Sequence, residues 1–386
     1  MASENISEFY SAVCAEHGTK INPFILDVLE NTVAAENVTL KLAGNNRSRL
    51  VQRLDDRDIL ALSECLKNYK CVTAGLDISF NNLTDEGVRY LADLLQEESS
   101  ALNAMDLMFN NIQTDGAQVL AESLQCNSTL LSLRLSGNKI ENRGAMHLAS
   151  MLQVNSSLEE LELAACDLAT QSVIAFAIVL KSNKTLRSVD ISRPLLFSHQ
   201  EEWAVHFSDM LMVNSSLVEL HLGKMGMTDS GMESLTEGLR HNHSLRYLDI
   251  RCNRVTRDGV LHLAKLLKEN PTLEIIDLSS NRIEDDGAVY LSEAITSPGC
   301  ILKELSVSSN NIKTEGLLSL AQAMKLNTVL SHIYIWGNHL EESVCQAFRE
   351  LIASGRLPPQ QTDVCAYEVD GHVFLAEVFN SLRKHY

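Results

Sequence analysis

Two closely spaced histidines, His241 and His243 in the segment HNHSL, are the residues whose spacing most suggests a metal site. Imidazole is a common zinc ligand, but a zinc ion needs three or four protein ligands. The segment lies where other parts of the chain read CNSTL or VNSSL, in a polar loop between an expected helix and an expected strand. We therefore interpret both histidines as loop residues and predict that the chain binds no metal.

Side chains that could catalyse a reaction are present without a catalytic arrangement. Serine, histidine and aspartate could supply a nucleophile and its base. However, the sequence contains no GxSxG, no HExxH and no glycine-rich phosphate loop. The positions of these residues follow from a repeat instead. The sequence therefore predicts a chain that is not an enzyme and needs no cofactor, and its function is expected to lie on a surface.

A repeat of about 28 residues must position any functional side chain. Segments such as LLSLRLSGNKI, LEELELAACDL and LEIIDLSSNRI follow the pattern L-x-x-L-x-L-x-x-N/C-x-L. The Asn position of this pattern is occupied by Asn81, Asn110, Asn138, Cys166, Pro194, Met225, Asn253, Asn281, Asn310 and Asn338. A weaker copy contains Asn45, so the repeat predicts eleven strands.

The physical basis of each repeat can be derived from one copy. In LRLSG the leucines alternate, so they point to one side of a short strand and into a core. The following Asn can bond backbone groups of its own turn and of the next coil, which predicts a ladder of amides. A helical pattern that begins near a glycine follows each strand. Because one unit cannot bury its apolar face alone, the units must stack.

The repeats resemble those of ribonuclease-inhibitor-like leucine-rich-repeat proteins, over residues 37–355. This resemblance implies an α/β solenoid, a horseshoe with about eleven parallel strands on its concave side and helices on its convex side. It also implies a range of functions. Relatives of this class include interaction scaffolds, inhibitors of basic nucleases, activators of small nuclear-transport GTPases, and components of motile-cilium assemblies such as radial spokes.

Acidic and aromatic side chains between the core leucines are expected to face the open, concave side. An acidic surface would attract a basic partner and speed its encounter, whereas Asp at this position could also be a common filler. The predicted protein-binding residues are Phe80, Asp106, Phe109, Glu160, Glu162, Asp190, Glu219, Tyr247, Asp249, Asp277, Glu304, His332, Tyr334 and Trp336.

Aromatic residues mark both ends of this predicted surface. His332, Tyr334 and Trp336 are expected to be exposed on the last repeat, where aromatic residues make good interface anchors. The alternative is that the C-terminal segment folds over them. Phe80 and Phe109, with Met108, form a second apolar patch near the other end, so the two patches could hold one extended partner.

The ends of the chain are predicted to form caps. Residues 1–36 contain two helical segments that would cover the first coil. Residues 356–386 contain a loop, a β-hairpin centred on Asp370 and Gly371, and a short tail.

One repeat is three residues longer than its neighbours. The extra residues lie between Leu195 and Trp203, after Pro194, which has no N–H to donate. We interpret this insertion as tolerated. The alternative is that Phe197, His199 and Trp203 form a lateral surface for a second partner, or that the solenoid changes curvature there.

Composition limits the kinds of partner. The net charge is −18, which disfavours nucleic acid and anionic membranes and favours basic or extended protein segments. Nine cysteines without a CxxC pair, no apolar run long enough for a membrane span and no secretory signal predict a protein inside the cell. The leading hypothesis is an interaction scaffold, and the resemblance implies a place in a large assembly such as the motile-cilium axoneme. The alternatives are a nuclear or nucleolar adaptor of a basic protein and a small-GTPase regulator, although no acidic tail is present.

Overall fold

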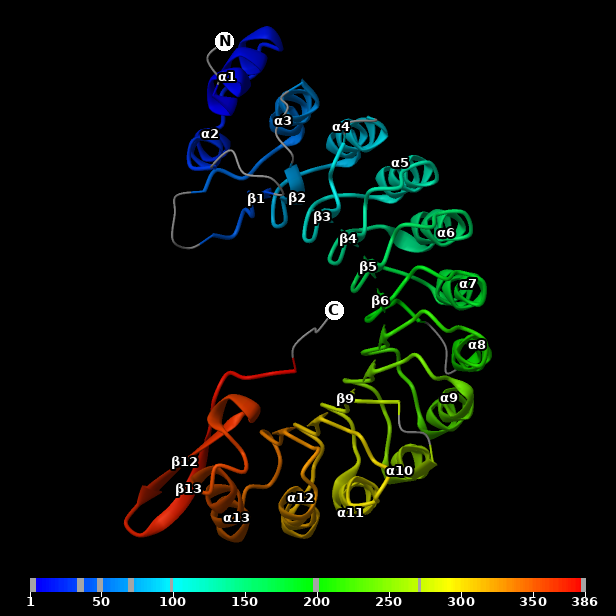
Figure 1. The fold of residues 1–386 in the computed structure, drawn as a ribbon, viewed down its shortest axis with the longest axis vertical. Coiled ribbons are helices and arrows are strands. Elements are labelled where there is room, and N and C mark those ends of the chain that lie inside the picture. Colours follow the sequence, from blue (N-terminus) through cyan, green and yellow to red (C-terminus); the bar gives the residue numbers. More distant parts are fainter. Residues whose placement is uncertain are drawn as a thin grey trace. The chain divides into compact units, whose positions relative to one another are not determined.

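The computed structural model describes residues 5–32, 38–46, 51–68, 73–97, 100–196, 201–269 and 272–382 (Figure 1). The chain divides into two compact units, Met1–Leu195 and Leu196–Tyr386. In both units short strands alternate with helices, and the helices lie on one side of the strands. The eleven predicted strands are confirmed as β1 to β11.

The first unit opens with two helices and continues with strand–helix repeats. Its elements are α1 (Ile6–Glu16), α2 (Pro23–Glu30), β1 (Val38–Lys41), α3 (Asp56–Asn68), β2 (Thr73–Asp77), α4 (Asp85–Gln96), β3 (Ala104–Asp106), α5 (Thr114–Leu124), β4 (Ser132–Arg134), α6 (Glu141–Met151), β5 (Glu160–Glu162), α7 (Thr170–Leu180) and β6 (Ser188–Asp190). The strands pair in parallel and in chain order. Met105, Leu133 and Leu161 lie side by side in this register, so each strand adds one leucine-like residue to a continuous core.

The second unit continues the same alternation and ends in a hairpin. Its elements are α8 (Glu202–Leu211), β7 (Glu219–His221), α9 (Asp229–His241), β8 (Tyr247–Asp249), α10 (Arg257–Glu269), β9 (Ile275–Asp277), α11 (Glu284–Ile295), β10 (Glu304–Ser306), α12 (Thr314–Leu326), β11 (His332–Tyr334), α13 (Glu342–Ala353), a short 3₁₀ helix (Pro359–Gln361), β12 (Val364–Val369) and β13 (His372–Glu377). Strands β7 to β11 are again parallel.

The predicted amide ladder explains how successive turns are held together. Asn138 donates from Nδ2 to the carbonyls of Leu107 and Leu135, at 2.9 and 2.8 Å, and accepts from the N–H of Ile112 at 3.1 Å. One side chain thus satisfies backbone groups of two neighbouring coils that would otherwise be buried without partners.

Cys166 fills the same position with a thiol. Its Sγ donates to the carbonyl of Leu135 at 3.1 Å, but it offers no counterpart of the amide oxygen. Burial raises the pKa of the Cys166 thiol to about 12, so it stays protonated and can act as this donor at neutral pH.

The two ends of the chain pack on their neighbouring repeats. At the N-terminal end, Asn22 accepts from the N–H of Phe24 to cap α2, and it donates to the carboxylate of Asp58 in α3 at 3.0 Å. At the C-terminal end, β12 and β13 form the predicted antiparallel hairpin, and Asp370 and Gly371 at its turn both have positive φ. The division at residues 36 and 355 stays a prediction.

Candidate interaction surface

The strand face of the first unit carries a cluster of carboxylates around one guanidinium. Arg134 on β4 lies 3.0 Å from Glu160 and 3.6 Å from Glu162 on β5, and 4.0 Å from Asp106 on β3. Asp106, Arg134 and Glu162 occupy equivalent positions on three adjacent strands, and Glu160 lies two residues before Glu162 on the same face of β5. The cluster therefore keeps a net negative charge.

Asp106 is the least satisfied carboxylate of this cluster. Burial, together with the negative charges of Asp77 and Glu162, raises the pKa of Asp106 to about 6, against the lowering effects of the Met108 N–H and of Arg134. A positive group that arrived from outside would favour the ionised form. The electrostatics of this surface therefore suit a basic ligand.

Replacing Asp106 with asparagine is expected to stabilise the protein at pH 7 by only about 1–2 kcal/mol, because solvent screens part of the unfavourable charge on this partly exposed carboxylate. The sign follows from the raised pKa: ionisation of Asp106 costs more in the folded than in the unfolded chain. In the wild type this cost disappears as the pH falls through about 6 towards 3.8, so stability should rise in that window. Thermal melts across pH 4–7 should show that rise in the wild type and lose it in Asp106→Asn. A variant that is less stable at pH 7 would contradict this account.

Two phenylalanines lie beside the cluster, at the ends of neighbouring strands. The rings of Phe80 and Phe109 stack with centroids 4.6 Å apart and planes 18° apart, and the Phe109 side chain is 50% exposed. Gly137 follows in the next repeat, where an added Cβ would come within 2.5 Å of the Phe109 ring. The predicted apolar patch at this end is therefore present, and Gly137 leaves room for it.

The strand face of the second unit is a buried polar network. His221 on β7 places Nε2 3.2 Å from Glu219 and Nδ1 3.3 Å from Asp249 on β8. Arg251 lies 3.2 Å from the same Asp249 carboxylate, and the Tyr247 ring packs edge-on against His221. His221, Glu219 and Asp249 bond one another across adjacent strands, which accounts for the burial of their charges, whereas the Arg251 side chain stays 47% exposed.

The expectation that all the predicted residues face solvent is wrong for more than half of them. Those with almost no exposed surface are Glu162, Asp190, Glu219, Tyr247, Asp249, Asp277, Glu304 and Tyr334. Neighbouring strands are only about 4.8 Å apart, so side chains at the same repeat position cover one another. Phe80, Asp106, Phe109, Glu160, His332 and Trp336 keep accessible surface.

The C-terminal segment covers the last strand. Asp363 accepts from the backbone N–H groups of Ile335 and Trp336, at 2.8 and 3.0 Å, and from the Ser308 hydroxyl at 2.8 Å. In an inner repeat a carbonyl of the next strand accepts such an N–H, as Tyr334 does from Val307. The structure thus favours a cap over an exposed aromatic anchor, and Tyr334 is buried while Trp336 is half-buried.

Of the three residues predicted as a lateral surface in the long repeat, the structure describes Trp203. Phe197 and His199 lie outside the described residues. Trp203 is only 1% exposed and packs edge-on against Phe207 within α8, so its assignment to an exposed surface is wrong. An apolar ring at the second position of α8 points into the core rather than outward.

Glu201 shows how the long repeat joins its successor. Its carboxylate accepts from the backbone N–H and the hydroxyl of Thr228, which precedes α9. Asp229 does the same for Thr256 in the following repeat, and Asp56 for Thr84 in the first unit. The longer side chain of glutamate thus fills a position that aspartate takes elsewhere.

Replacing Glu201 with alanine is expected to cost about 1–2 kcal/mol, because the N-terminal turn of α9 loses its acceptor. The same substitution at Glu202, which is exposed, should change stability by less than about 0.5 kcal/mol. Urea titration of both variants measures the difference. Equal effects would show that Glu201 does not join the two repeats.

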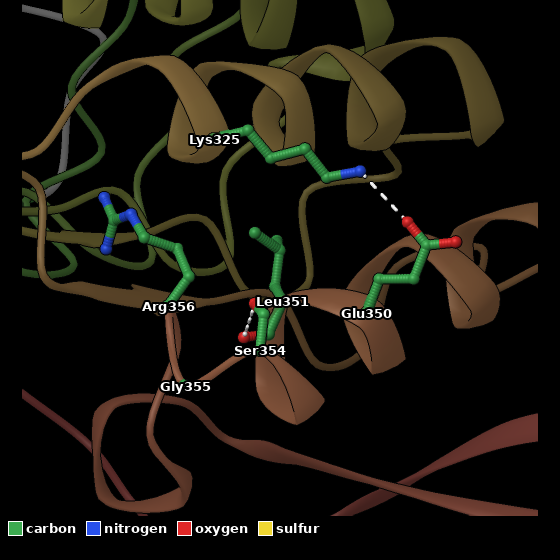
Figure 2. Close-up of a pocket in the computed structure, with 6 residues that line it drawn as sticks. All are labelled: Lys325, Glu350, Leu351, Ser354, Gly355 and Arg356. Atoms are coloured by element: carbon green, nitrogen blue, oxygen red, sulfur yellow. Dashed lines mark hydrogen bonds and ion pairs between the residues drawn. The ribbon is translucent and has the colours of Figure 1, made fainter.

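The two loop histidines and one surface pocket are the remaining features of the described residues that were candidates for a chemical site. His241 and His243 are exposed, and within the described ranges no group of three His, Cys, Asp or Glu side chains could hold a metal ion. A pocket of about 560 Å³ lies between α12 and α13 (Figure 2). Lys325 in this pocket pairs with Glu350 at 3.1 Å, and Arg356 donates to the carbonyls of Met324, Asn327 and Leu330, so its polar groups already have partners. No helix in the described part of the chain could cross a membrane.

Comparison with known proteins agrees with the repeat and with this geometry. A family model described as Leucine Rich repeat matches residues 76–92, 99–121, 126–149, 241–264, 269–292 and 300–321. Among solved structures, actin-binding site 2 of leiomodin-1 aligns with 38% of this chain and 84% of its own, at 19% identity and a TM-score of 0.33. A score that low has no bearing on function.

Strands in register, an amide ladder and outer helices define a leucine-rich-repeat protein with an α/β solenoid fold. Leucine-rich repeat-containing protein 34 from Homo sapiens is 57% identical over 99% of this chain and 83% of its own length. The proteins of the same name from Rattus norvegicus and Mus musculus are 54% and 50% identical, each over 99% of this chain and 93% of their own. The chain belongs to the leucine-rich repeat-containing protein 34 family.

Proposed function

We propose that this protein is a non-enzymatic scaffold that binds a basic or extended segment of a partner protein on the strand face of β2–β5. The observation that supports it best is the cluster around Arg134, in which Asp106, Glu160 and Glu162 share one guanidinium. Such a surface steers a positively charged partner and fixes its position more than it adds raw affinity. The same charge disfavours direct contact with nucleic acid or anionic membranes.

We propose a structural role in a large assembly inside the cell, the motile-cilium axoneme, as part of a radial spoke or an associated complex. This rests on the resemblance to repeat proteins of such assemblies and on a surface suited to holding a partner rather than transforming one. The main alternative is a nuclear or nucleolar adaptor, which would use the same acidic face for a basic protein. A GTPase-activating role is a further alternative, and a GTP-hydrolysis assay with a panel of small GTPases would reveal it.

Zero-length crosslinking in ciliated tissue tests this proposal. A carbodiimide joins a carboxylate directly to a lysine amine, so a partner on the strand face should become joined to Asp106 or Glu160. Axonemes that are extracted with detergent should retain the protein and yield such crosslinks to axonemal proteins. Crosslinks only to ribosome-assembly factors would contradict the axonemal role, and crosslinks only from the outer helices would contradict the proposed face.

A further inference from the structure

In the ten repeats that follow β2 to β11, the residue directly before the ladder position has left-handed backbone geometry. The residues with positive φ there are Phe80, Phe109, Gly137, Ala165, Arg193, Lys224, Cys252, Ser280, Ser309 and Gly337. Glycine adopts this conformation without steric cost, whereas a bulky side chain does so at a cost. The conformation is thus a property of the repeat, and the repeats differ only in which residue adopts it.

Phe80 and Phe109 are therefore unfavourable choices for their positions. Their φ values are 58° and 53°, and they occupy consecutive repeats. Neither ring belongs to the buried core between strands and helices: Phe80 is half-buried, and half of the Phe109 side chain is exposed. The two strained residues thus present one stacked apolar surface to solvent, which we call the Phe80–Phe109 ledge.

Two carboxylates accept hydrogen bonds from the backbone of the same two turns. The carboxylate of Asp77 accepts from the N–H of Ser79, directly before Phe80, at 3.1 Å. That of Asp106 accepts from the N–H of Met108, directly before Phe109, at the same distance. A ligand that lay on the rings could therefore reach both carboxylates with a long basic side chain.

We propose that the Phe80–Phe109 ledge is the anchor point for an extended partner segment that carries an arginine next to a leucine or an aromatic residue. The apolar residue would pack on the rings, and the guanidinium would reach Asp77 and Asp106. Arginine suits this place better than lysine because its planar group both stacks on aromatic rings and pairs with carboxylates in a fixed geometry. This inference rests on the proposed function and names the partner chemistry of the same face.

Glycine substitutions separate recognition from folding at these positions. In Phe80→Gly/Phe109→Gly the rings are lost, but the residues introduced are those that the left-handed backbone prefers, so the fold should persist. The matched control is Ser280→Gly/Ser309→Gly, which makes the same backbone change at the equivalent positions after β9 and β10. Thermal melts of both variants should stay within a few degrees of the wild type.

The probe is a short fluorescein-labelled peptide of alternating arginine and leucine, titrated at physiological salt and followed by fluorescence anisotropy. The phenylalanine variant should weaken binding by about tenfold or more, and the serine control by less than about twofold. A peptide of alternating arginine and serine should bind the wild type more weakly and be insensitive to both variants.

Three results would contradict the proposal that the Phe80–Phe109 ledge anchors a partner. They are unchanged affinity of the phenylalanine variant for the arginine–leucine peptide, an equal loss in the serine control, and no saturable binding by the wild type. The proposed function is tested separately with Asp106→Asn/Glu160→Gln, and unchanged peptide binding by that variant would contradict it. If Asp106→Asn/Glu160→Gln weakens peptide binding while the phenylalanine variant does not, the acidic face stands and the ledge is wrong.

Discussion

Replacing His221 with alanine is expected to lower the free energy of unfolding by about 3 kcal/mol, because it leaves two buried carboxylates without their shared partner. His221 is 1% exposed, and each ring nitrogen faces a carboxylate oxygen, of Glu219 and of Asp249. A ring that donates from both nitrogens carries a positive charge. Removal of the ring would therefore leave an excess of buried negative charge on β7 and β8.

The pH dependence of stability gives this prediction a specific signature. Burial acts to raise the pKa of Asp249, but the hydrogen bond from His221 and the charge of Arg251 outweigh it and hold the pKa below its ordinary value. Asp249 thus stabilises the fold at a pH above the ordinary aspartate range, and this contribution is lost as the pH falls through the lowered folded-state pKa. Urea titrations that continue below the ordinary aspartate pKa of about 3.9 should show that acid loss in the wild type and a shallower one in His221→Ala.

The exposed residue His243 provides the control. His243→Ala removes the same side chain from a loop and should change stability by less than about 0.5 kcal/mol. If His221→Ala were equally mild, or more stable than the wild type, the network would not hold β7 and β8 together as described.

Replacing Asp363 with alanine is the second change with a large expected effect, a loss of about 3 kcal/mol, since the buried N–H of Ile335 and the partly buried N–H of Trp336 lose their acceptor. Asp363 replaces the strand that would follow β11, by accepting from Ile335 and Trp336. Without Asp363 these N–H groups stay unpaired, because water does not easily reach them in the folded chain. The end of the sheet is therefore expected to open more often. A fall in the thermal midpoint together with faster hydrogen exchange at Ile335 and Trp336 would show this loss.

Asparagine at position 363 should give an intermediate loss of stability. Asp363→Asn keeps one acceptor oxygen, so it should cost roughly half as much as alanine. Glu377→Ala, an exposed change on β13, serves as the control and should be close to neutral. If exchange at Ile335 and Trp336 stayed slow in Asp363→Ala, the capping role of this carboxylate would be wrong.

The period of the repeat was sufficient to predict the strands and the role of the Asn ladder. Leucine alternation depends only on local geometry, and Asn138 needs only its own turn and the next one to bond. For the same reason Cys166 could be assigned as a weaker donor from its position alone. These features depend only on one coil and its neighbour in the repeat, so they can be predicted from a single sequence.

Burial on the strand face could not be predicted in the same way. The exposed fraction of Glu219 or Asp249 depends on the side chain one repeat away, and on whether both bond a shared group such as His221. Trp203 was wrongly predicted to be exposed. The extra residues before it made the start of the helix, and hence the inward-facing side of α8, difficult to locate from the sequence. Asp363 gave no signal, since it acts on atoms 28 residues earlier in the chain through a loop without a repeat.

Carboxylate footprinting of the assembled protein tests the claim of a strand-face scaffold most directly. Free protein and protein in its isolated assembly would be labelled with carbodiimide and glycine ethyl ester and compared by mass spectrometry. Asp106 and Glu160 should become protected on assembly, while Glu86 and Glu122, exposed on helices α4 and α5, should label equally in both states. Protection of Glu86 and Glu122 with unchanged labelling of Asp106 and Glu160 would contradict it.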